Sequence, residues 1–375
     1  MTDGPRRFVC LDPRKAKRKA VADALAGLGP IRWLRIPPMR LRGYPETATE
    51  AQTALNMSKD RDRGPLVARL NRWLFALQYN GARAYFAANP DAVAVCWNGL
   101  NGTRRAFMQG ARHAGARLLF FELAPLPGRV TIDPNGVNFA NSLPRKIGPY
   151  LAWAKAESPA PDAWRTAGRD IRQRAPMQAK ATPGDLPPLD APFLFVPLQT
   201  PGDSQLRLFG GAFPTVEGFI DALVAASAQL PEGWHIRVKE HPTAPTSFAD
   251  KFAGTDQHPI YLDNATDTFS QVAASRGVIT VNSSVGLESM FYDKPVVACG
   301  QCFWAIPGVA DSAPTPQALA DLCSNPGALG YDAAARDAFM NFLTQCYYPE
   351  PATAAALVAA RLQGPDRFGF WQVQP

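Results

Sequence analysis

The feature that most constrains the fold of this chain is a short apolar run that breaks at polar residues and resumes as a helix. Residues 277–281 (Gly-Val-Ile-Thr-Val) are rich in β-branched side chains, as in a buried strand. Asn282, Ser283 and Ser284 follow, and an apolar helical pattern begins at Val285. A strand-to-helix turn of this kind presents backbone N–H groups at the positive end of a helix dipole, which favours binding of an anion such as phosphate.

A second strand pattern, at residues 235–239, ends in Glu240-His241-Pro242. Pro242 favours an extended conformation at His241 and therefore ends the strand there. In α/β sheets, ligands bind outside the carboxyl ends of the parallel strands. We therefore expect His241 and the serine pair to lie at one edge of a sheet, around the phosphate of a nucleotide.

Each of these residues also has a structural interpretation. A histidine at a strand end can be satisfied by a backbone carbonyl, so His241 need not touch a ligand. Ser283 and Ser284 can cap the following helix, although capping and ligand binding are compatible at one helix terminus. Gly286 would let a ligand approach the backbone closely. Glu288, one turn into the helix, either accepts hydrogen bonds from ribose hydroxyls or occupies a solvated position.

Length and composition indicate a globular protein with two domains. A chain of 375 residues is too long for one ordinary core, and 46% hydrophobic with 19% charged residues is typical of folded proteins. No apolar run reaches the roughly 18–20 residues of a membrane span. The first residues lack the apolar centre of a secretory signal. These features favour a cytoplasmic location.

The balance of charge favours anionic partners. The chain has 39 Lys and Arg against 32 Asp and Glu, a formal charge of +7 and a pI near 9.2. The densest basic run, residues 14–19, is either a solvated helix face or a segment attracted to an anionic membrane surface. No zinc-finger spacing, aromatic RNA-binding strand or helix-turn-helix pattern is present, so we expect no nucleic-acid partner.

The six cysteines are scattered, and in a cytoplasmic chain they are expected to be reduced. Cys299 and Cys302 have C-x-x-C spacing, but no second Cys or His pair stands at the spacing of a zinc site. The alternative interpretation of this pair is a strand end followed by a loop. We expect no metal site.

The order of patterns predicts an α/β fold with two domains. Residues 1–175 alternate strand and helix patterns, with strands at 7–12, 92–97 and 117–122. They predict an N-terminal Rossmann-like domain, which in a two-domain arrangement would hold the acceptor substrate. The segment 176–192 is rich in Pro, Ala and Asp and reads as a linker. Residues 193–345 repeat the alternation and predict a C-terminal Rossmann-like domain that binds the nucleotide. Residues 346–375 form a C-terminal tail, predicted to be helical. Two such domains facing a cleft match the GT-B architecture.

Four short segments together resemble the capsule polysaccharide biosynthesis family, which includes the retaining β-Kdo transferases of transporter-dependent capsule systems. They are residues 238–242 (Val-Lys-Glu-His-Pro), 281–288 (Val-Asn-Ser-Ser-Val-Gly-Leu-Glu), 292–296 (Tyr-Asp-Lys-Pro-Val) and 303–308 (Phe-Trp-Ala-Ile-Pro-Gly). Gln199 with Asp203, and the N-terminal segments 121–128 and 133–138, also fit. The resemblance covers about residues 92–350.

The resemblance implies a glycosyltransferase that uses CMP-Kdo, or a related CMP-activated acidic sugar, with retention and without a metal or other cofactor. Single-module relatives add the first Kdo to a lysophosphatidylglycerol anchor, which implies an anionic lysophospholipid or glycolipid acceptor. The expected location is then peripheral, at the inner face of the cytoplasmic membrane, with other capsule biosynthesis and export proteins as partners. The donor-binding residues that it implies are Gln199, Glu240, His241, Pro242, Asn282, Ser283, Ser284, Gly286 and Glu288.

Retaining transfer needs either a nucleophilic carboxylate or a front-face route. Glu122 ends a strand of the first domain, and Asp203 follows a strand of the second. A pair of carboxylates across the cleft could divide the nucleophile and acid/base roles, in an order that the sequence leaves open. His241 near the donor phosphate could stabilise CMP as it leaves.

Further residues are candidates by position. Asn98 and Gly99 stand in the first β–α turn of the N-terminal unit and could contact acceptor or donor. Asp133 either faces the cleft or forms a turn, because Asp-Pro-Asn-Gly is a strong turn signal. Phe303 and Trp304 either stack on a sugar or base or pack in the interior.

Three other functions fit the sequence less well. A serine hydrolase with Ser284 at a nucleophile elbow would need a later histidine, but the last one is His258. A dinucleotide oxidoreductase would need G-x-G-x-x-G after a strand, and none is present. The remaining alternative is a noncatalytic lipid- or polysaccharide-binding protein built on a degenerate transferase fold.

Overall fold

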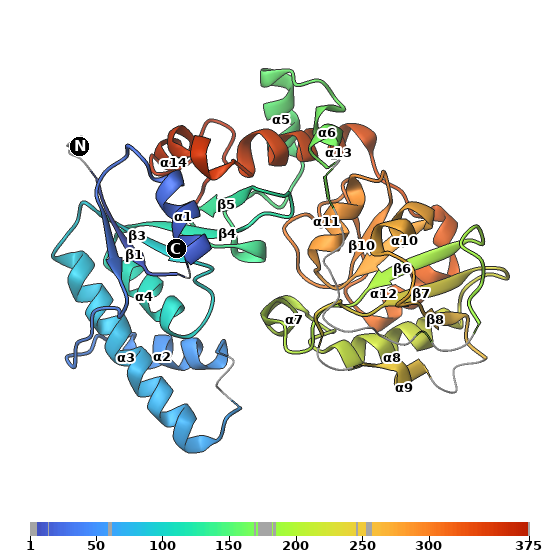
Figure 1. Ribbon diagram of the computed structural model, residues 1–375, viewed down its shortest axis with the longest axis horizontal. Helices are drawn as coiled ribbons and strands as arrows, with labels where there is room; N and C mark the ends of the chain where they lie inside the picture. Colours follow the sequence, from blue (N-terminus) through green and yellow to red (C-terminus); the bar gives the residue numbers. More distant parts are fainter. Residues whose placement is uncertain are drawn as a thin grey trace. The chain divides into compact units, whose positions relative to one another are not determined.

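The computed structural model describes residues 6–13, 15–58, 62–168, 170–171, 182, 185–244, 247–252 and 257–373. The chain forms two compact units (Figure 1). Unit 1 consists of Met1–Pro144 together with Leu343–Pro375, and unit 2 of Arg145–Phe342. We describe each unit by itself.

Unit 1 is built on a five-stranded sheet of order β2-β1-β3-β4-β5. The pairs among β2, β1, β3 and β4 are parallel, and β5 runs antiparallel to β4. The strands are β1 (Arg7–Leu11), β2 (Ile31–Leu34), β3 (Ala92–Trp97), β4 (Arg117–Leu123) and β5 (Val130–Asp133). The helices are α1 (Lys15–Ala24), α2 (Thr47–Asn56), α3 (Pro65–Ala87), α4 (Gly102–His113) and α14 (Ala355–Arg361). All six residues of β3 are buried, as expected for a central strand covered on both faces.

The C-terminal segment returns to the sheet of unit 1. The backbone N–H of Val130 in β5 donates to the carbonyl of Pro349 at 3.0 Å. The buried guanidinium of Arg361 donates to the carbonyls of Ile132, Cys346 and Tyr347. Burial lowers the pKa of Arg361 to about 10. The predicted C-terminal tail is therefore helical in part, and it is packed against the N-terminal sheet through this arginine.

Unit 2 is a parallel sheet of order β11-β10-β9-β6-β7-β8. The strands are β6 (Phe193–Pro197), β7 (His235–Lys239), β8 (Ile260–Leu262), β9 (Gly277–Thr280), β10 (Val296–Ala298) and β11 (Asp311–Ser312). The helices are α5 (Gly148–Glu157), α6 (Ala163–Ala167), α7 (Ser204–Phe209), α8 (Val216–Ser227), α9 (Ala249–Phe252), α10 (Thr268–Ala274), α11 (Ser284–Met290), α12 (Pro316–Ser324) and α13 (Ala333–Phe342).

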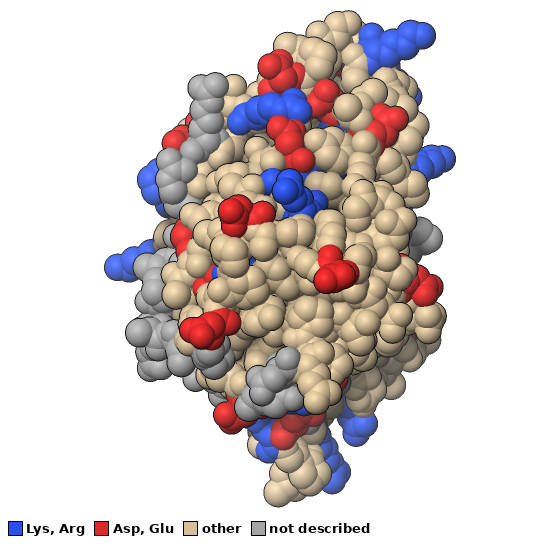
Figure 2. All heavy atoms as spheres, turned by 90° about the vertical axis from the view of Figure 1, so that its right-hand side faces the viewer, with Lys and Arg blue, Asp and Glu red and all other residues tan. Residues whose placement is uncertain are grey.

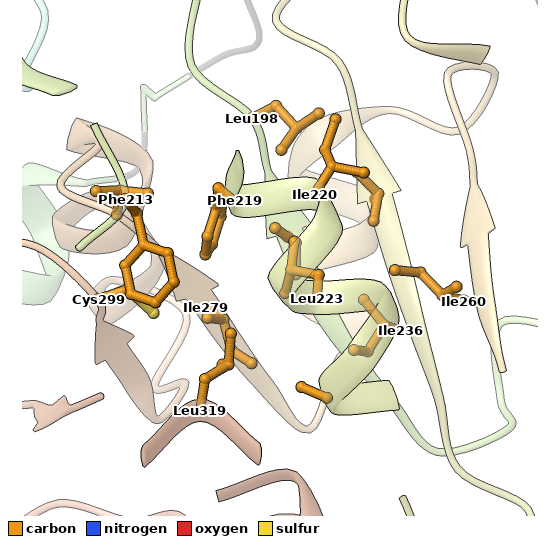
Figure 3. Packing of buried hydrophobic residues seen from close by; sticks show 14 of the residues in the cluster. Leu198, Phe213, Phe219, Ile220, Leu223, Ile236, Ile260, Ile279, Cys299 and Leu319 are labelled. Carbon is orange, nitrogen blue, oxygen red and sulfur yellow. The ribbon is translucent and has the colours of Figure 1, made fainter. Parts of the chain in front are cut away.

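The core of unit 2 lies between the sheet and α8. Phe219 and Leu223 of α8 point toward Ile236 of β7 and Ile279 of β9 (Figure 3). Every residue of β6 is buried, because successive side chains of a central strand face opposite layers and both faces are covered. The buried strand β6 therefore fixes the position of the loop that begins after Pro197.

The predicted fold class is confirmed: both units are α/β with Rossmann-like sheets, and the C-terminal region is helical. The division of the chain differs from the predicted boundaries at 175 and 345. Residues 145–171 belong to unit 2 because Tyr150 of α5 packs edge-on against Phe339 and Phe342 of α13, with centroids 5.1 and 5.4 Å apart. Of the predicted linker 176–192, residues 176–181, 183 and 184 lie outside the described residues.

None of the helices among the described residues combines the length and apolarity needed to cross a bilayer. The basic run predicted at 14–19 begins α1, and Arg14 lies outside the described residues. Two of its side chains lie over aromatic rings, Lys17 at 4.7 Å from the Trp97 ring centroid and Arg18 at 4.6 Å from that of Trp33. This run is therefore partly used in contacts within unit 1.

One face of β7 buries three basic side chains. His235 stacks on Phe193 with centroids 5.4 Å apart, Arg237 lies 3.5 Å from the carboxylate of Asp263, and Lys239 donates to two backbone carbonyls. Burial, with a smaller contribution from Arg237, lowers the pKa of His235 from 6.5 to about 4. The histidine is therefore neutral in the folded protein at pH 7.

Acid should destabilise unit 2 through His235. Because the folded pKa lies below the unfolded value, the unfolded chain binds more protons as the pH falls from 6.5 toward 4. The free energy of unfolding should decrease over this range by up to about 3 kcal/mol. His235→Phe, which retains a ring between Phe193 and Tyr261, should flatten that dependence in urea unfolding followed by circular dichroism. Equal slopes of the midpoint against pH for both proteins would contradict this assignment.

Candidate functional site

The sheet of unit 2 changes direction at β6. The chain adds β7 and β8 on one side of β6, then crosses to add β9, β10 and β11 on the other. The loops that follow β6 and β9 therefore leave the sheet in opposite directions, and this switch point is where open α/β sheets bind ligands. Because the strands are parallel, the residues after β6, β7 and β9 lie at one edge of the sheet.

Gln199 and Asn282 join the two loops at this point. The Gln199 side-chain amide donates to Asn282 Oδ1 at 2.9 Å, and the Asn282 backbone N–H donates to Gln199 Oε1 at 3.2 Å. Asn282 Nδ2 in turn donates to the carbonyl of Gln205 in α7 at 3.0 Å. Gln199 is buried. The sequence placed both residues at the donor site, and the structure brings them together as a paired amide.

Asp203 caps α7. One carboxylate oxygen accepts from the backbone N–H of Gln205 at 2.9 Å, and the other lies 3.4 Å from the side-chain nitrogen of Gln199. Both oxygens are thus engaged by neighbours in unit 2. The predicted carboxylate lies at the expected edge, in a position that orients α7 and Gln199.

The two serines differ in their surroundings. Ser283 Oγ accepts from the backbone N–H of Val285 at 3.2 Å, so the capping interpretation holds for this residue. Ser284 begins α11 and is exposed. Glu288, on the next turn of this short helix, is half-buried. Ser284 is therefore the more accessible hydroxyl at this edge.

Gly286 stands where a larger residue would collide with its neighbours. A Cβ atom at this position would lie 2.7 Å from Cη2 of Trp304 and 2.9 Å from Cγ2 of Thr280. The glycine makes room for the Trp304 ring, which is buried, as is Phe303. The two aromatic residues pack in the interior, and a ligand contact at Gly286 stays a prediction.

His241 follows β7 and has a defined tautomer. Its Nδ1 accepts from the Thr243 backbone N–H at 3.2 Å and lies 3.0 Å from the Thr243 hydroxyl. A ring nitrogen that accepts an N–H carries no proton, so the neutral ring holds its proton on Nε2. His241 and Pro242 are half-buried. The geometry makes His241 a hydrogen-bond donor through Nε2.

The neighbouring Glu240 is held inside unit 2. Its carboxylate accepts from the Ser247 hydroxyl at 3.0 Å, from the Phe248 backbone N–H, and from the Asn264 side-chain amide at 3.2 Å. These bonds tie together the loops that follow β7 and β8, and the side chain is buried. Glu240 therefore positions the loop that carries His241.

His241 and the serine pair are not on adjacent strands. β6 lies between β7 and β9, so their loops are separated by two strand spacings, about 10 Å. Gln199 lies in the loop that follows β6, the strand between them. His241 and the serine pair thus share one edge of the sheet but lie apart, and the Gln199–Asn282 pair connects the loops between them.

A second polar cluster stands at the carboxyl edge of the sheet in unit 1. Glu122 accepts from the indole N–H of Trp97 and from the Asn98 side-chain amide, each at 2.9 Å, and from the Leu123 backbone N–H at 3.0 Å. Lys17 lies over the Trp97 ring. Lys17 and Trp97 were not predicted as site residues. For Lys17, the basic run at residues 14–19 was the sequence feature that could have indicated it.

The loop after β3 requires unusual backbone conformations. Asn98 has φ of 69° and Gly99 has φ of 75°, the left-handed region in which most side chains are strained. A Cβ at Gly99 would lie 2.5 Å from the Phe120 ring. Gly99 thus shapes the turn that presents Asn98 to Glu122; a contact of Asn98 or Gly99 with acceptor or donor stays a prediction.

Asp133 is fully buried and accepts hydrogen bonds from the residues around it. Of its two interpretations, the one in which it faces a cleft is therefore wrong. Its carboxylate accepts from the backbone N–H groups of Asn135, Gly136 and Ser142, and from the hydroxyls of Ser142 and Tyr347. Burial raises the pKa of Asp133, and the backbone hydrogen bonds act in the opposite direction. The turn-forming interpretation of this residue holds.

The Cys299–Cys302 pair shows no features of a redox or metal site. Both thiols are buried, and burial raises their pKa above the ordinary value, which keeps them protonated and unreactive. Within the described residues, no three His, Cys, Asp or Glu side chains are grouped to hold a metal ion.

Comparison with known proteins supports the family resemblance over part of the chain. Residues 173–341 match the family model described as capsule polysaccharide biosynthesis protein, and this range contains the whole carboxyl edge of unit 2. Over these residues the chain is similar to the capsule polysaccharide biosynthesis family. The family prediction made from the sequence motifs is confirmed.

Two curated relatives are similar in sequence. The chain is 30% identical to protein FixF of Sinorhizobium fredii over 271 residues, which cover 70% of this chain and 63% of FixF. It is also 30% identical to the capsule polysaccharide modification protein LipB of Neisseria meningitidis serogroup A over 146 residues, 36% of this chain and 33% of LipB. The chain thus spans less than two thirds of the length of these relatives.

Among solved structures, the β-Kdo 2,4 transferase of Thermosulfurimonas dismutans KpsC is 18% identical, with a TM-score of 0.49 covering 95% of this chain and 98% of that one. The β-Kdo 2,7 transferase of the same protein is 11% identical, with a TM-score of 0.49 over 88% and 89% of the two chains.

Gly286→Ala should destabilise unit 2 by about 1–3 kcal/mol, because the added methyl group overpacks the buried contact with Trp304. The matched control is Gly327→Ala, where a Cβ meets nothing within 4 Å. Urea unfolding followed by circular dichroism gives both values. A Gly286→Ala protein as stable as the control would show that this glycine is not required for packing.

Proposed function

We propose that this chain is a glycosyltransferase of capsule polysaccharide biosynthesis, and that it transfers Kdo or a related acidic sugar from a CMP-activated donor. The observation that carries the proposal is the junction of three loops at the switch point of the family-matched unit, where His241 and Ser284 flank the Gln199–Asn282 pair. Polar donors at the carboxyl edge of a parallel sheet are the usual setting for a nucleotide.

The arrangement of donors supports a phosphate-containing ligand. The Thr243 contact at Nδ1 places the proton of the neutral His241 ring on Nε2, and Ser284 has an exposed hydroxyl. Their loops are separated by about 10 Å, a span that the phosphate and nucleoside parts of one nucleotide can bridge. In this proposal His241 donates to the phosphate, and the donated hydrogen bond stabilises the charge that develops on CMP as the sugar leaves.

Glu122 and Asp203 are the carboxylates proposed for the transfer with retention. Glu122 is fixed by three N–H donors and is therefore held in one orientation, as a nucleophile or an acid/base requires. Asp203 is engaged by the cap of α7 and by Gln199, which suits a role in positioning. We accordingly favour Glu122 as the reacting carboxylate.

The proposed acceptor is an anionic lysophospholipid or glycolipid. The resemblance to single-module Kdo transferases and the formal charge of +7 support a lipid acceptor of negative charge. The enzyme would then act at the inner face of the cytoplasmic membrane, beside other proteins of capsule biosynthesis and export, and without a metal or other cofactor.

A direct assay tests the reaction. The full chain is incubated with CMP-Kdo and lysophosphatidylglycerol, and mass spectrometry is used to look for a product that carries one Kdo. His241→Ala should lower the transfer rate about 100-fold, as expected for loss of a general acid or a charge-stabilising donor. His258→Ala is the control, because His258 precedes β8 and so lies at the opposite, amino edge of the same sheet.

Two results would contradict the proposal. A chain that neither forms the product nor binds CMP would not be a CMP-sugar transferase. A chain that binds CMP, is stabilised by it against thermal unfolding, and transfers sugar to no acceptor would instead be the noncatalytic binding protein. Equal losses in His241→Ala and His258→Ala would remove the role assigned to His241.

A further inference from the structure

The N-terminal half of α3 carries an exposed apolar stripe. Leu66, Leu70 and Trp73 recur at spacings of four and three residues, so they share one face of the helix. Their side chains are 81%, 62% and 55% exposed. Helix α3 runs along unit 1 as its longest helix (Figure 1). Leucine and tryptophan side chains exposed together in this way mark an interaction surface.

The segment 35–42 extends this surface. It exposes Ile36, Met39 and Leu41. The Arg40 backbone N–H donates to the carbonyl of Leu77 in α3 at 3.0 Å, and a Cβ at Gly81 would lie 2.2 Å from the carbonyl oxygen of Pro38. The segment is therefore fixed along the same helix, one turn beyond Trp73.

Within the two segments that form this surface, all charged side chains are positive. The segments 35–42 and 65–76 contain five arginines and no acidic residue. The arginines, all exposed, are Arg35, Arg40, Arg42, Arg69 and Arg72. Glu46 and Glu50, from the neighbouring α2 region, are paired with Arg83 at 2.5 Å and Arg105 at 3.4 Å. The face drawn in Figure 2, by contrast, carries acidic and basic side chains intermingled.

A groove of about 570 Å³ adjoins the stripe, between α2 and α3. Tyr44 and Ala48 line one side, and Arg69, Arg72 and Trp73 line the other. Arg72 donates to Gln52 at 3.3 Å, which holds its guanidinium at the α2 side. Two guanidinium groups beside an aromatic ring provide a place for a phosphate head group, because arginine binds phosphate oxygens in a bidentate manner.

We propose that this surface, formed by segment 35–42 and residues 65–76, docks unit 1 on an anionic phospholipid bilayer. Leu66, Leu70 and Trp73 enter the boundary between head groups and acyl chains, and the arginines contact lipid phosphates. A protein partner would favour an interface core depleted of charge, whereas single-sign arginines interleaved with aliphatic and indole side chains match an anionic membrane. This inference rests on the proposed function, because it names the surface that would meet the proposed membrane. Its test measures binding to vesicles and does not depend on sugar transfer.

Vesicle sedimentation of the full chain tests this surface. The vesicles contain phosphatidylcholine with or without about one third phosphatidylglycerol. Wild-type protein should bind the anionic vesicles and not the neutral ones. The pair Leu70→Ser with Trp73→Ser should weaken binding at least tenfold. The pair Arg69→Gln with Arg72→Gln should weaken it about 25-fold, because each charge near the surface contributes about fivefold.

Two controls separate this surface from the other basic and apolar parts of the chain. Lys15→Gln with Lys19→Gln removes the same charge from α1 and should change binding less than the arginine pair. Leu151→Ser removes an exposed leucine from unit 2 and should leave binding unchanged. Because all the altered side chains are exposed, circular dichroism and thermal unfolding should be unaffected.

The proposal is overturned if the α3 variants bind as wild type does, or if the lysine pair alone abolishes binding. Equal binding to neutral and anionic vesicles would also overturn it. So would sedimentation velocity showing a dimer that the Leu70→Ser, Trp73→Ser variant dissociates, since the surface would then join two copies of the chain. Loss of sugar transfer with intact vesicle binding would count against the proposed reaction and not against this surface.

Discussion

The candidate site depends on how a parallel sheet is held together where its strand order reverses. At β6 the following strands are added first on one side and then on the other, and the loops diverge. The paired amides of Gln199 and Asn282 join these loops, and Asn282 also holds the carbonyl of Gln205 in α7. Because an unpaired buried amide is costly, this arrangement keeps both loops in one geometry. The positions of Asp203, Ser283 and Ser284 follow from it.

Several polar residues in the motifs have structural roles. Glu240 and Asp133 are buried carboxylates, each satisfied by several donors from neighbouring loops. Gly286 accommodates Trp304. The geometry of these loops depends on these residues. Of the motif residues at this edge of unit 2, Ser284 is exposed and His241 is half-buried, and these two are the ligand contacts that we propose.

Some of the fold could be predicted from the sequence because its signals are local. The strands 92–97 and 235–239 were predicted to the residue, since apolar runs bounded by turn residues mark buried strands. β5 was not predicted: it is four residues long, and its partner β4 and the returning C-terminal segment, through Pro349, determine it. The place of residues 145–171 in unit 2 rests on packing of Tyr150 against α13, for which the sequence carries no local pattern.

The most direct test of this account is hydrogen–deuterium exchange of the full chain with saturating CMP. If a cytidylate binds at the switch point, amides in 198–206, 240–244 and 281–288 should become protected together, while those of α12 on the same unit should not change. Protection confined to unit 1, or no protection at any of the three loops in a chain that transfers sugar from a CMP donor, would contradict it.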